Sequence, residues 1–146
     1  MLLKAGAAVA AIVGSIAVLA HAGERNPIES RVPPSELAGA KALKNPIPMT
    51  AENIAKGRSI YVTKGQCIHC HGEGGKGDGL AGKVLNPSPR DFTNPDFHGN
   101  RTDGELFWVI KNGSAESGMM PMIGSMITES EAWYVILYER SFEGRK

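Results

Sequence analysis

Three segments of the chain carry apolar residues at helical spacing, each with a helix-start signal. A first helix is predicted from Thr50 to about Val62, where Gly57 and Tyr61 lie one turn apart on the same face. The segments 102–113 and 128–142 each open with Thr-x-x-Glu, the capping-box pattern, and continue into apolar and aromatic runs. The pattern therefore predicts an all-α fold with three or more helices.

Long loops join these helices, and the longest runs from about residue 72 to residue 99. It is rich in glycine and proline and contains no convincing strand. A loop of this length is uncommon in a compact domain unless something else organises it. A large rigid cofactor would supply the missing interior.

The first 49 residues divide into two parts. Residues 1–22 hold one positive charge, an apolar run and a small-residue pattern ending at Ala22, which is typical of a secretory signal peptide. The run falls only slightly short of a spanning length, so an uncleaved N-terminal membrane anchor is the alternative. Residues 23–49 contain five prolines and are predicted to be an extended linker, with at most a weak helical turn around Ser35–Lys44. The folded domain is then predicted at 50–146.

The charge is balanced overall but uneven along the chain. Removing residues 1–22 takes away Lys4 and no acidic residue, so 15 basic and 15 acidic groups remain. This balance argues against a nucleic-acid partner. Residues 56–90 carry six basic groups against two acidic ones, and residues 91–143 carry nine acidic groups against three basic ones. The basic stretch is either a solvated surface or a docking face for an acidic redox partner.

The sequence Cys67-Ile-His-Cys70-His71 carries the candidate chemistry. Two thiols three positions apart can add to the two vinyl groups of one porphyrin, and the next histidine can bind its iron. A structural zinc site would need four ligands, and a thioredoxin-like redox pair would need flanking strands. The motif therefore predicts a single covalently attached haem c.

With these residues in place, the chain resembles the class I monohaem c-type cytochromes over about residues 50–143. The resemblance rests on Gly57 and Tyr61, the Cys67–His71 motif, the segment 102–113, the Met120-Pro121 pair and the aromatic last helix. It implies an all-α fold wrapped around one covalently bound haem, with the first and last helices crossing through Gly57 and Tyr61.

The resemblance also implies the ligands around the haem. His71 would be the proximal iron ligand, and Met120 the sixth ligand because it directly precedes Pro121, with Met119 and Met122 as alternatives. His98 and His69 are weaker candidates. A backbone carbonyl would hold the second nitrogen of His71, with Pro87 as the expected residue and Pro89 next. Arg90 would face a haem propionate.

Filled axial positions on both sides of the iron leave no substrate site, so the predicted activity is one-electron transfer rather than enzymatic catalysis. The protein would act as a respiratory electron shuttle or as a subunit of a membrane-bound complex. It would work in the periplasm, on the outer side of the bacterial inner membrane, with redox proteins as partners. The alternative is a haem enzyme or gas sensor with a labile sixth ligand.

Overall fold

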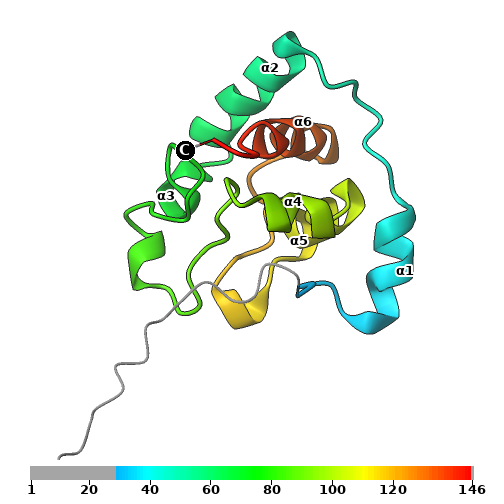
Figure 1. Cartoon of the computed structure of the whole chain (residues 1–146), viewed down its shortest axis with the longest axis horizontal. Coiled ribbons are helices and arrows are strands. Elements are labelled where there is room, and N and C mark those ends of the chain that lie inside the picture. Colours follow the sequence, from blue (N-terminus) through cyan, green and yellow to red (C-terminus); the bar gives the residue numbers. More distant parts are fainter. Residues whose placement is uncertain (1–28, 146) are drawn as a thin grey trace, which may run out of the picture.

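The computed structural model describes residues 29–145 and contains six α-helices joined by long loops (Figure 1). Within this part of the chain the β structure is limited to two isolated bridges, so the all-α prediction is confirmed. None of the helices described here is long and apolar enough to span a membrane. The signal or anchor predicted at residues 1–22 lies outside the described residues. The helices are α1 Pro34–Ala42, α2 Ala51–Val62, α3 Ile68–His71, α4 Pro95–Asn100, α5 Asp103–Asn112 and α6 Glu129–Arg140, with 3-10 turns η1 Gly82–Val84 and η2 Ala115–Ser117.

The three predicted helices form where their capping signals stand. The Thr50 hydroxyl accepts a hydrogen bond from the Asn53 amide at the start of α2. Thr102 and Thr128 each take part in a complete capping box at the starts of α5 and α6. Each box satisfies amide groups that would otherwise lack partners in the first turn.

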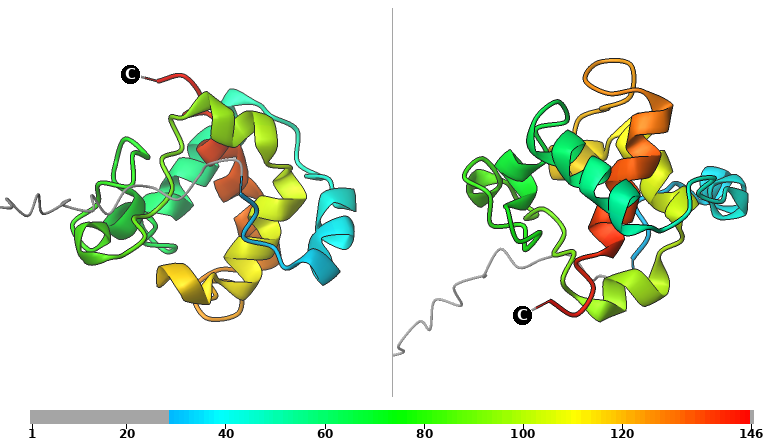
Figure 2. Two further views of the ribbon diagram at one scale, coloured as in Figure 1. Left: turned by 60° about the horizontal axis from the view of Figure 1, so that its bottom comes forward. Right: turned by 90° about the horizontal axis from the view of Figure 1, so that it is seen from above.

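Helix α2 crosses α6 at a point of very close approach (Figure 2). A side chain at Gly57 would collide with the Tyr134 carbonyl and press on the Tyr138 side chain, so only glycine fits. One turn later the rings of Tyr61 and Tyr138 meet edge to face, with centroids 5.1 Å apart. The crossing implied by the family resemblance is therefore confirmed.

Helix α5 lies beside the same central helix. The Phe107 ring stacks on Trp133 of α6 with centroids 4.1 Å apart and planes only 11° from parallel. Leu106 and Ile110 are buried on α5, and Val135 and Ile136 are buried on α6. The core thus lies between α2, α5 and α6.

The segment before α2 differs from the extended linker that its prolines predicted. It contains the nine-residue helix α1, which packs against α5 on the side away from α2 (Figure 1). Ala40 is buried there, and its carbonyl comes so close to Gly104 that a side chain on Gly104 would collide with it. Val32 is also buried. The sequence predicted at most a weak turn around Ser35–Lys44, because the contacts that stabilise the full helix are with α5, far away in the sequence.

The long loop after α3 folds back onto α3 through main-chain hydrogen bonds. The amides of Gly77, Gly79 and Ala81 donate to the carbonyls of His71, Cys70 and His69 at 3.0, 3.2 and 2.9 Å. Helix α4 follows this loop, in a stretch for which no helix was predicted. The loop is therefore ordered by the motif that precedes it.

Candidate functional site

Helix α3 is a single turn that presents the two cysteines and the histidine of the motif. The His71 amide donates to the Cys67 carbonyl at 2.9 Å, closing the turn. The Cys67 amide donates to the Tyr61 carbonyl at 2.9 Å, which ties the turn to the end of α2. Cys67 and Cys70 are both free and half-buried. The spacing predicted from the sequence therefore brings all three side chains to one short helix.

The ring of His71 is fixed on two sides. Its Nδ1 atom lies 3.4 Å from the Arg90 carbonyl, and the ring stacks on Phe92 with centroids 4.5 Å apart. Burial lowers the pKa of His71 to about 4, so the imidazole is neutral at pH 7. Nε2 is then the nitrogen available to a metal. The prediction that Pro87 or Pro89 supplies the carbonyl was wrong, since the chain turns so that Arg90 does.

His71 faces a cavity with mainly apolar walls from the loop and from α5. Phe92, Leu106 and Ile110 line it, together with the side chain of Met119. The loop that carries Met119 is held by the Ser114 amide, which donates to the Met119 carbonyl at 2.8 Å. The structure thus places a thioether and an imidazole in one cavity.

The structure places the methionines differently from the sequence-based choice. Met120 is 71% exposed, whereas its neighbour Met119 is half-buried and lines the cavity with His71. Met122 is half-buried and packs against the core. Met120 as an iron ligand remains a prediction from the Met-Pro pair, and the cavity supports Met119.

The other two candidate histidines have different surroundings. His69 is exposed. His98 is buried, with Nε2 hydrogen-bonded to the Phe92 carbonyl and Nδ1 bound to the Arg140 guanidinium at 3.1 Å. Burial, together with the positive charge of Arg140, lowers the pKa of His98. Both of its nitrogens are engaged, so His98 serves as a structural link between α4 and α6.

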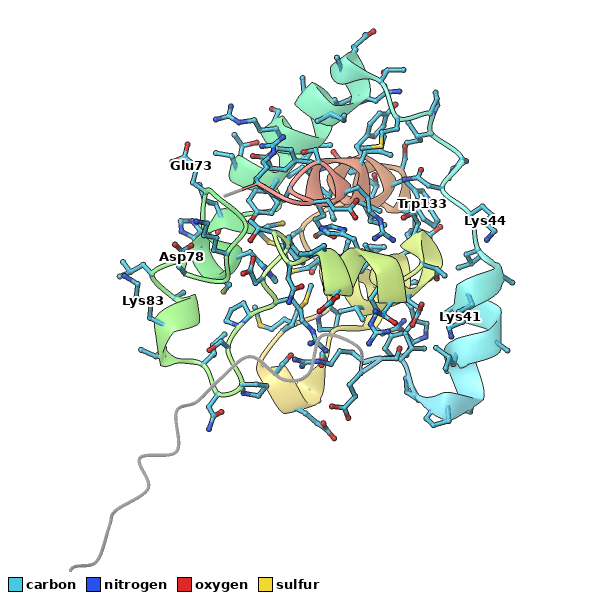
Figure 3. All side chains as sticks on the ribbon, in the orientation of Figure 1. Lys41, Lys44, Glu73, Asp78, Lys83 and Trp133 are labelled. Atoms are coloured by element: carbon cyan, nitrogen blue, oxygen red, sulfur yellow. The ribbon has the colours of Figure 1, made fainter. Side chains whose placement is uncertain are left out.

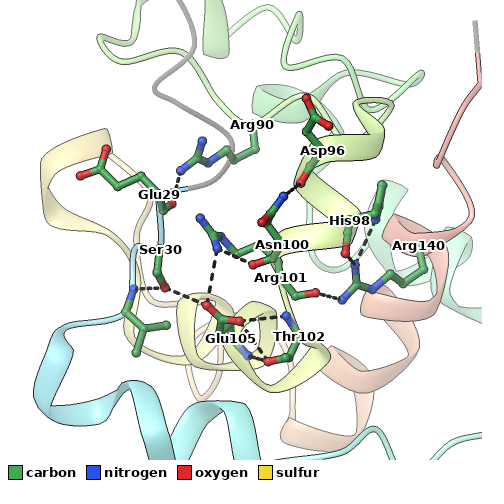
Figure 4. A network of polar contacts seen from close by, with 11 residues as sticks. Glu29, Ser30, Arg90, Asp96, His98, Asn100, Arg101, Thr102, Glu105 and Arg140 are labelled. Carbon is green, nitrogen blue, oxygen red and sulfur yellow. Dashed lines mark hydrogen bonds and ion pairs between the residues drawn. The ribbon is translucent and has the colours of Figure 1, made fainter.

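Polar side chains form a network along one side of the cavity (Figure 4). The Ser30 hydroxyl donates to Glu105 at 2.9 Å, and Glu105 lies 3.8 Å from the guanidinium of Arg101. Arg90 is buried and donates to the Glu29 carbonyl at 2.9 Å. Residues before α1 thus form part of the cavity wall together with Arg90, and the contact of Arg90 with a haem propionate stays a prediction.

Glu139 of α6 is the cavity residue that the sequence analysis missed. It is only 6% exposed and lines the same cavity as His71. Burial raises the pKa of its carboxyl group to about 8. Burial and, secondarily, the negative charge of Glu139 raise the pKa of Cys67 to about 12. A glutamate on a helix usually faces solvent, so only the packing of α6 could reveal its place.

The donor set of this site fits a covalently attached haem better than a bare metal ion. Among residues 29–145, no cluster of three or more His, Cys, Asp or Glu side chains is placed to bind a metal ion. A haem needs two thiols within one helical turn, one free imidazole nitrogen and an apolar cavity beside them. Cys67, Cys70 and His71 supply the first two, and the walls around Phe92 supply the third.

The predicted basic stretch is only partly available for docking. Lys64 is paired with Glu131 at 2.7 Å, Arg58 lies 3.8 Å from Glu73, and Arg90 is buried. Lys76 and Lys83 are exposed and belong to the loop around α3 and η1. Lys83 lies at the edge of the molecule opposite to Lys41 and Lys44 (Figure 3). Lys56 on α2 is exposed as well, so the accessible basic groups lie on this loop and on α2.

Comparisons with known proteins agree with this geometry. The family described as "Cytochrome C oxidase, cbb3-type, subunit III" matches residues 52–138. A solved chain of the reducing HAO-like protein complex of Kuenenia stuttgartiensis is similar, with 28% sequence identity and a TM-score of 0.57. The similarity covers 67% of this chain and 47% of that one, so this chain spans about half the length of that relative. No curated protein matches.

Proposed function

Since the chain belongs to the c-type cytochrome family described as cytochrome c oxidase, cbb3-type, subunit III, we propose that it carries single electrons on one haem c. Membership in this family indicates haem-based electron transfer in general. The observation that supports the specific proposal is the turn of α3, which presents Cys67, Cys70 and His71 beside one apolar cavity. The haem would be attached through thioether bonds to both cysteines.

Each residue of the site has a separate task in this proposal. Cys67 and Cys70 would fix the porphyrin, and His71 would bind the iron through Nε2. The Arg90 carbonyl would hold the Nδ1 proton, which orients the ring and makes it a stronger ligand. The buried Arg90 guanidinium would face a haem propionate. The haem, when bound, supplies an iron that alternates between two oxidation states.

We assign the sixth iron position to Met119. A thioether ligand must reach the cavity into which His71 points, and Met119 does so while Met120 is largely exposed. His71 and Met119 together would hold the iron and leave no position for a substrate, which would favour electron transfer over substrate turnover. Methionine ligation also raises the reduction potential.

The proposed setting is the periplasm, reached through the signal or anchor at residues 1–22. The protein would act as a respiratory shuttle or as a subunit that passes electrons to other redox proteins. The solved relative is itself part of a protein complex, which supports a role among redox partners. Purification from native membranes would show whether the chain travels alone or with such partners.

The central test is covalent haem attachment. The protein, expressed with a c-type maturation system, should gain the mass of one haem per chain and stain for haem on a denaturing gel. Replacing both cysteines, Cys67→Ala and Cys70→Ala, should abolish the stain because no thioether bond can form. An unmodified chain with two free thiols would contradict the proposal.

The ligand assignment is tested by comparing two neighbouring substitutions. Met119→Ala should remove the sixth ligand, so that the ferrous protein binds carbon monoxide readily and the reduction potential falls. Met120→Ala is the matched control and should leave both properties close to those of the wild type. The reverse result would return the assignment to Met120. Ready carbon monoxide binding by the wild type would instead support the haem enzyme or gas sensor.

A further inference from the structure

Glu139 is a buried carboxyl group for which electron transfer by itself requires no role. Its side chain is 6% exposed and lines the cavity with His71 and Met119. No residue in the described part of the chain donates a hydrogen bond to its carboxyl oxygens. An ionised carboxylate in such a place is costly unless something nearby compensates its charge.

Its neighbours compensate this charge only in part. Arg140 is the basic residue that acts on Glu139 most strongly, yet its guanidinium is bound to Asp103 at 2.8 Å and to His98. Arg101 is likewise beside Glu105. The titratable and charged groups around Glu139 are Arg140 on α6, Asp103 and Glu105 on α5, Tyr61 on α2, His98 on α4, Cys67 and His71 at α3, and Arg31, Arg90 and Arg101 from the connecting segments.

We propose that Glu139 is a proton-binding site coupled to the haem. When the haem accepts one electron from its donor protein, the Glu139 carboxylate takes up one proton from solvent, and it releases that proton when the electron leaves. The inference rests on the proposed function, because it requires a haem in the cavity that Glu139 lines.

The coupling follows from elementary electrostatics. The oxidised haem iron carries one more positive charge than the reduced iron, so the oxidised state favours an ionised carboxylate beside it. Reduction removes that charge and raises the affinity of Glu139 for a proton. The influence of Glu139 on Cys67 shows that its charge reaches the attachment motif. One electron and one proton then move together without a net change of charge in the cavity.

The sign of the pH dependence is fixed by this scheme. Burial raises the pKa of Glu139, and the scheme gives Glu139 a lower pKa beside the oxidised haem than beside the reduced haem. Below both of these pKa values, Glu139 is protonated in both oxidation states and the potential is high and flat. As the pH rises, reduction has to draw a proton from an increasingly dilute supply, so the potential falls. Between the two pKa values, where one proton accompanies each electron, a tenfold drop in proton concentration lowers the potential by about 59 mV, and above both values the potential is flat again.

The experiment is a redox titration of the haem-loaded protein at pH values on both sides of 8. The reduction potential of the wild type should fall as the pH rises. Glu139→Gln, which keeps the shape and cannot ionise, should remove this slope, and Glu139→Asp should retain it. The matched control is Glu143→Gln, an exposed glutamate one turn further along, which should behave as the wild type does. Haem propionates would give the same slope in all four proteins.

Proton uptake on reduction, measured in weakly buffered solution with an indicator dye, gives a second readout on the wild type alone. Uptake near pH 8 that Glu139→Gln abolishes would support the inference. Absence of uptake by the wild type, or an unchanged slope in Glu139→Gln, would overturn it. A chain that carries no haem would instead overturn the proposed function, so the two failures are distinct.

Discussion

Two neighbouring regions of the molecule, the α2–α6 crossing and the loop of residues 72–94, are held by different kinds of contact. At the crossing, side-chain shape allows the two helices to come close: Gly57 leaves room for the Tyr134 carbonyl, and Tyr61 packs on Tyr138. In the loop, main-chain amides donate to the carbonyls of α3. The crossing therefore depends on helix packing, whereas residues 77–81 of the loop depend on the main chain of α3.

The side chain of Tyr61 connects the two regions. The Tyr61 hydroxyl, buried at the crossing, donates to the Gly72 carbonyl at 2.8 Å, where the loop leaves α3. Burial raises the pKa of Tyr61, so the hydroxyl remains a donor throughout the physiological range. The α2–α6 crossing thus positions the loop as well as the helices.

The crossing is broken most directly at Gly57. Gly57→Ala should lower the free energy of unfolding by about 3 kcal/mol, because its methyl group overlaps the Tyr134 backbone. Denaturant unfolding monitored by circular dichroism measures this. Gly39→Ala is the control in α1, where no atom lies within 4 Å of the added group, and it should stabilise by about 0.5 to 1 kcal/mol. Equal effects at the two sites would contradict the close approach.

The connection between the regions is broken by Tyr61→Phe. Loss of the hydroxyl removes the shorter of the two hydrogen bonds to the buried Gly72 carbonyl and leaves the one from the Gly75 amide at 3.3 Å, so it should cost about 1.5 kcal/mol. Hydrogen exchange at the Gly77 and Ala81 amides should also become faster, because they belong to the loop that Tyr61 anchors. Tyr134→Phe, a half-buried control, should change neither. Unchanged exchange in the loop would mean that α3 orders it without Tyr61.

The smallest effect is expected at the start of α6. Thr128→Ala removes the hydroxyl that accepts from the Glu131 amide and should cost about 1 kcal/mol. Thermal unfolding is a sufficient measurement. Ser130→Ala, one position inside the helix and exposed, should leave stability nearly unchanged or slightly higher. Because the hydrogen bond from Tyr61 to the Gly72 carbonyl is kept in this variant, exchange in the loop should be unaffected, which separates this change from Tyr61→Phe.

The contrast between the two regions also explains which features the sequence could predict. Helices α2, α5 and α6 follow from caps and periodicity, which are local properties of a segment. The motif Cys67–His71 is equally local, because its chemistry depends on one helical turn.

The features that were missed or, like helix α1, predicted only as a weak turn depend on distant contacts. Helix α1 is stabilised where Ala40 meets Gly104, and nothing within its own segment announces that contact. Any residue can offer a carbonyl, so residue type could not distinguish Arg90 from Pro87 as the partner of His71. Glu139 has the composition of a surface residue and acquires its importance only from the cavity that α6 faces.

The segment before α1 determines where a recombinant fragment of this protein should begin. The family match begins at residue 52, and the sequence placed the start of the domain at residue 50. A recombinant fragment that starts at residue 50 would keep the α2–α6 crossing and the Cys67–His71 motif. It would lose Ser30 and Val32 from the cavity wall. Water would enter beside Glu105 and Glu139, and charges inside would be screened more strongly. Residues 29–49 therefore shield the cavity from solvent. Fragments meant for measuring the reduction potential should include these residues.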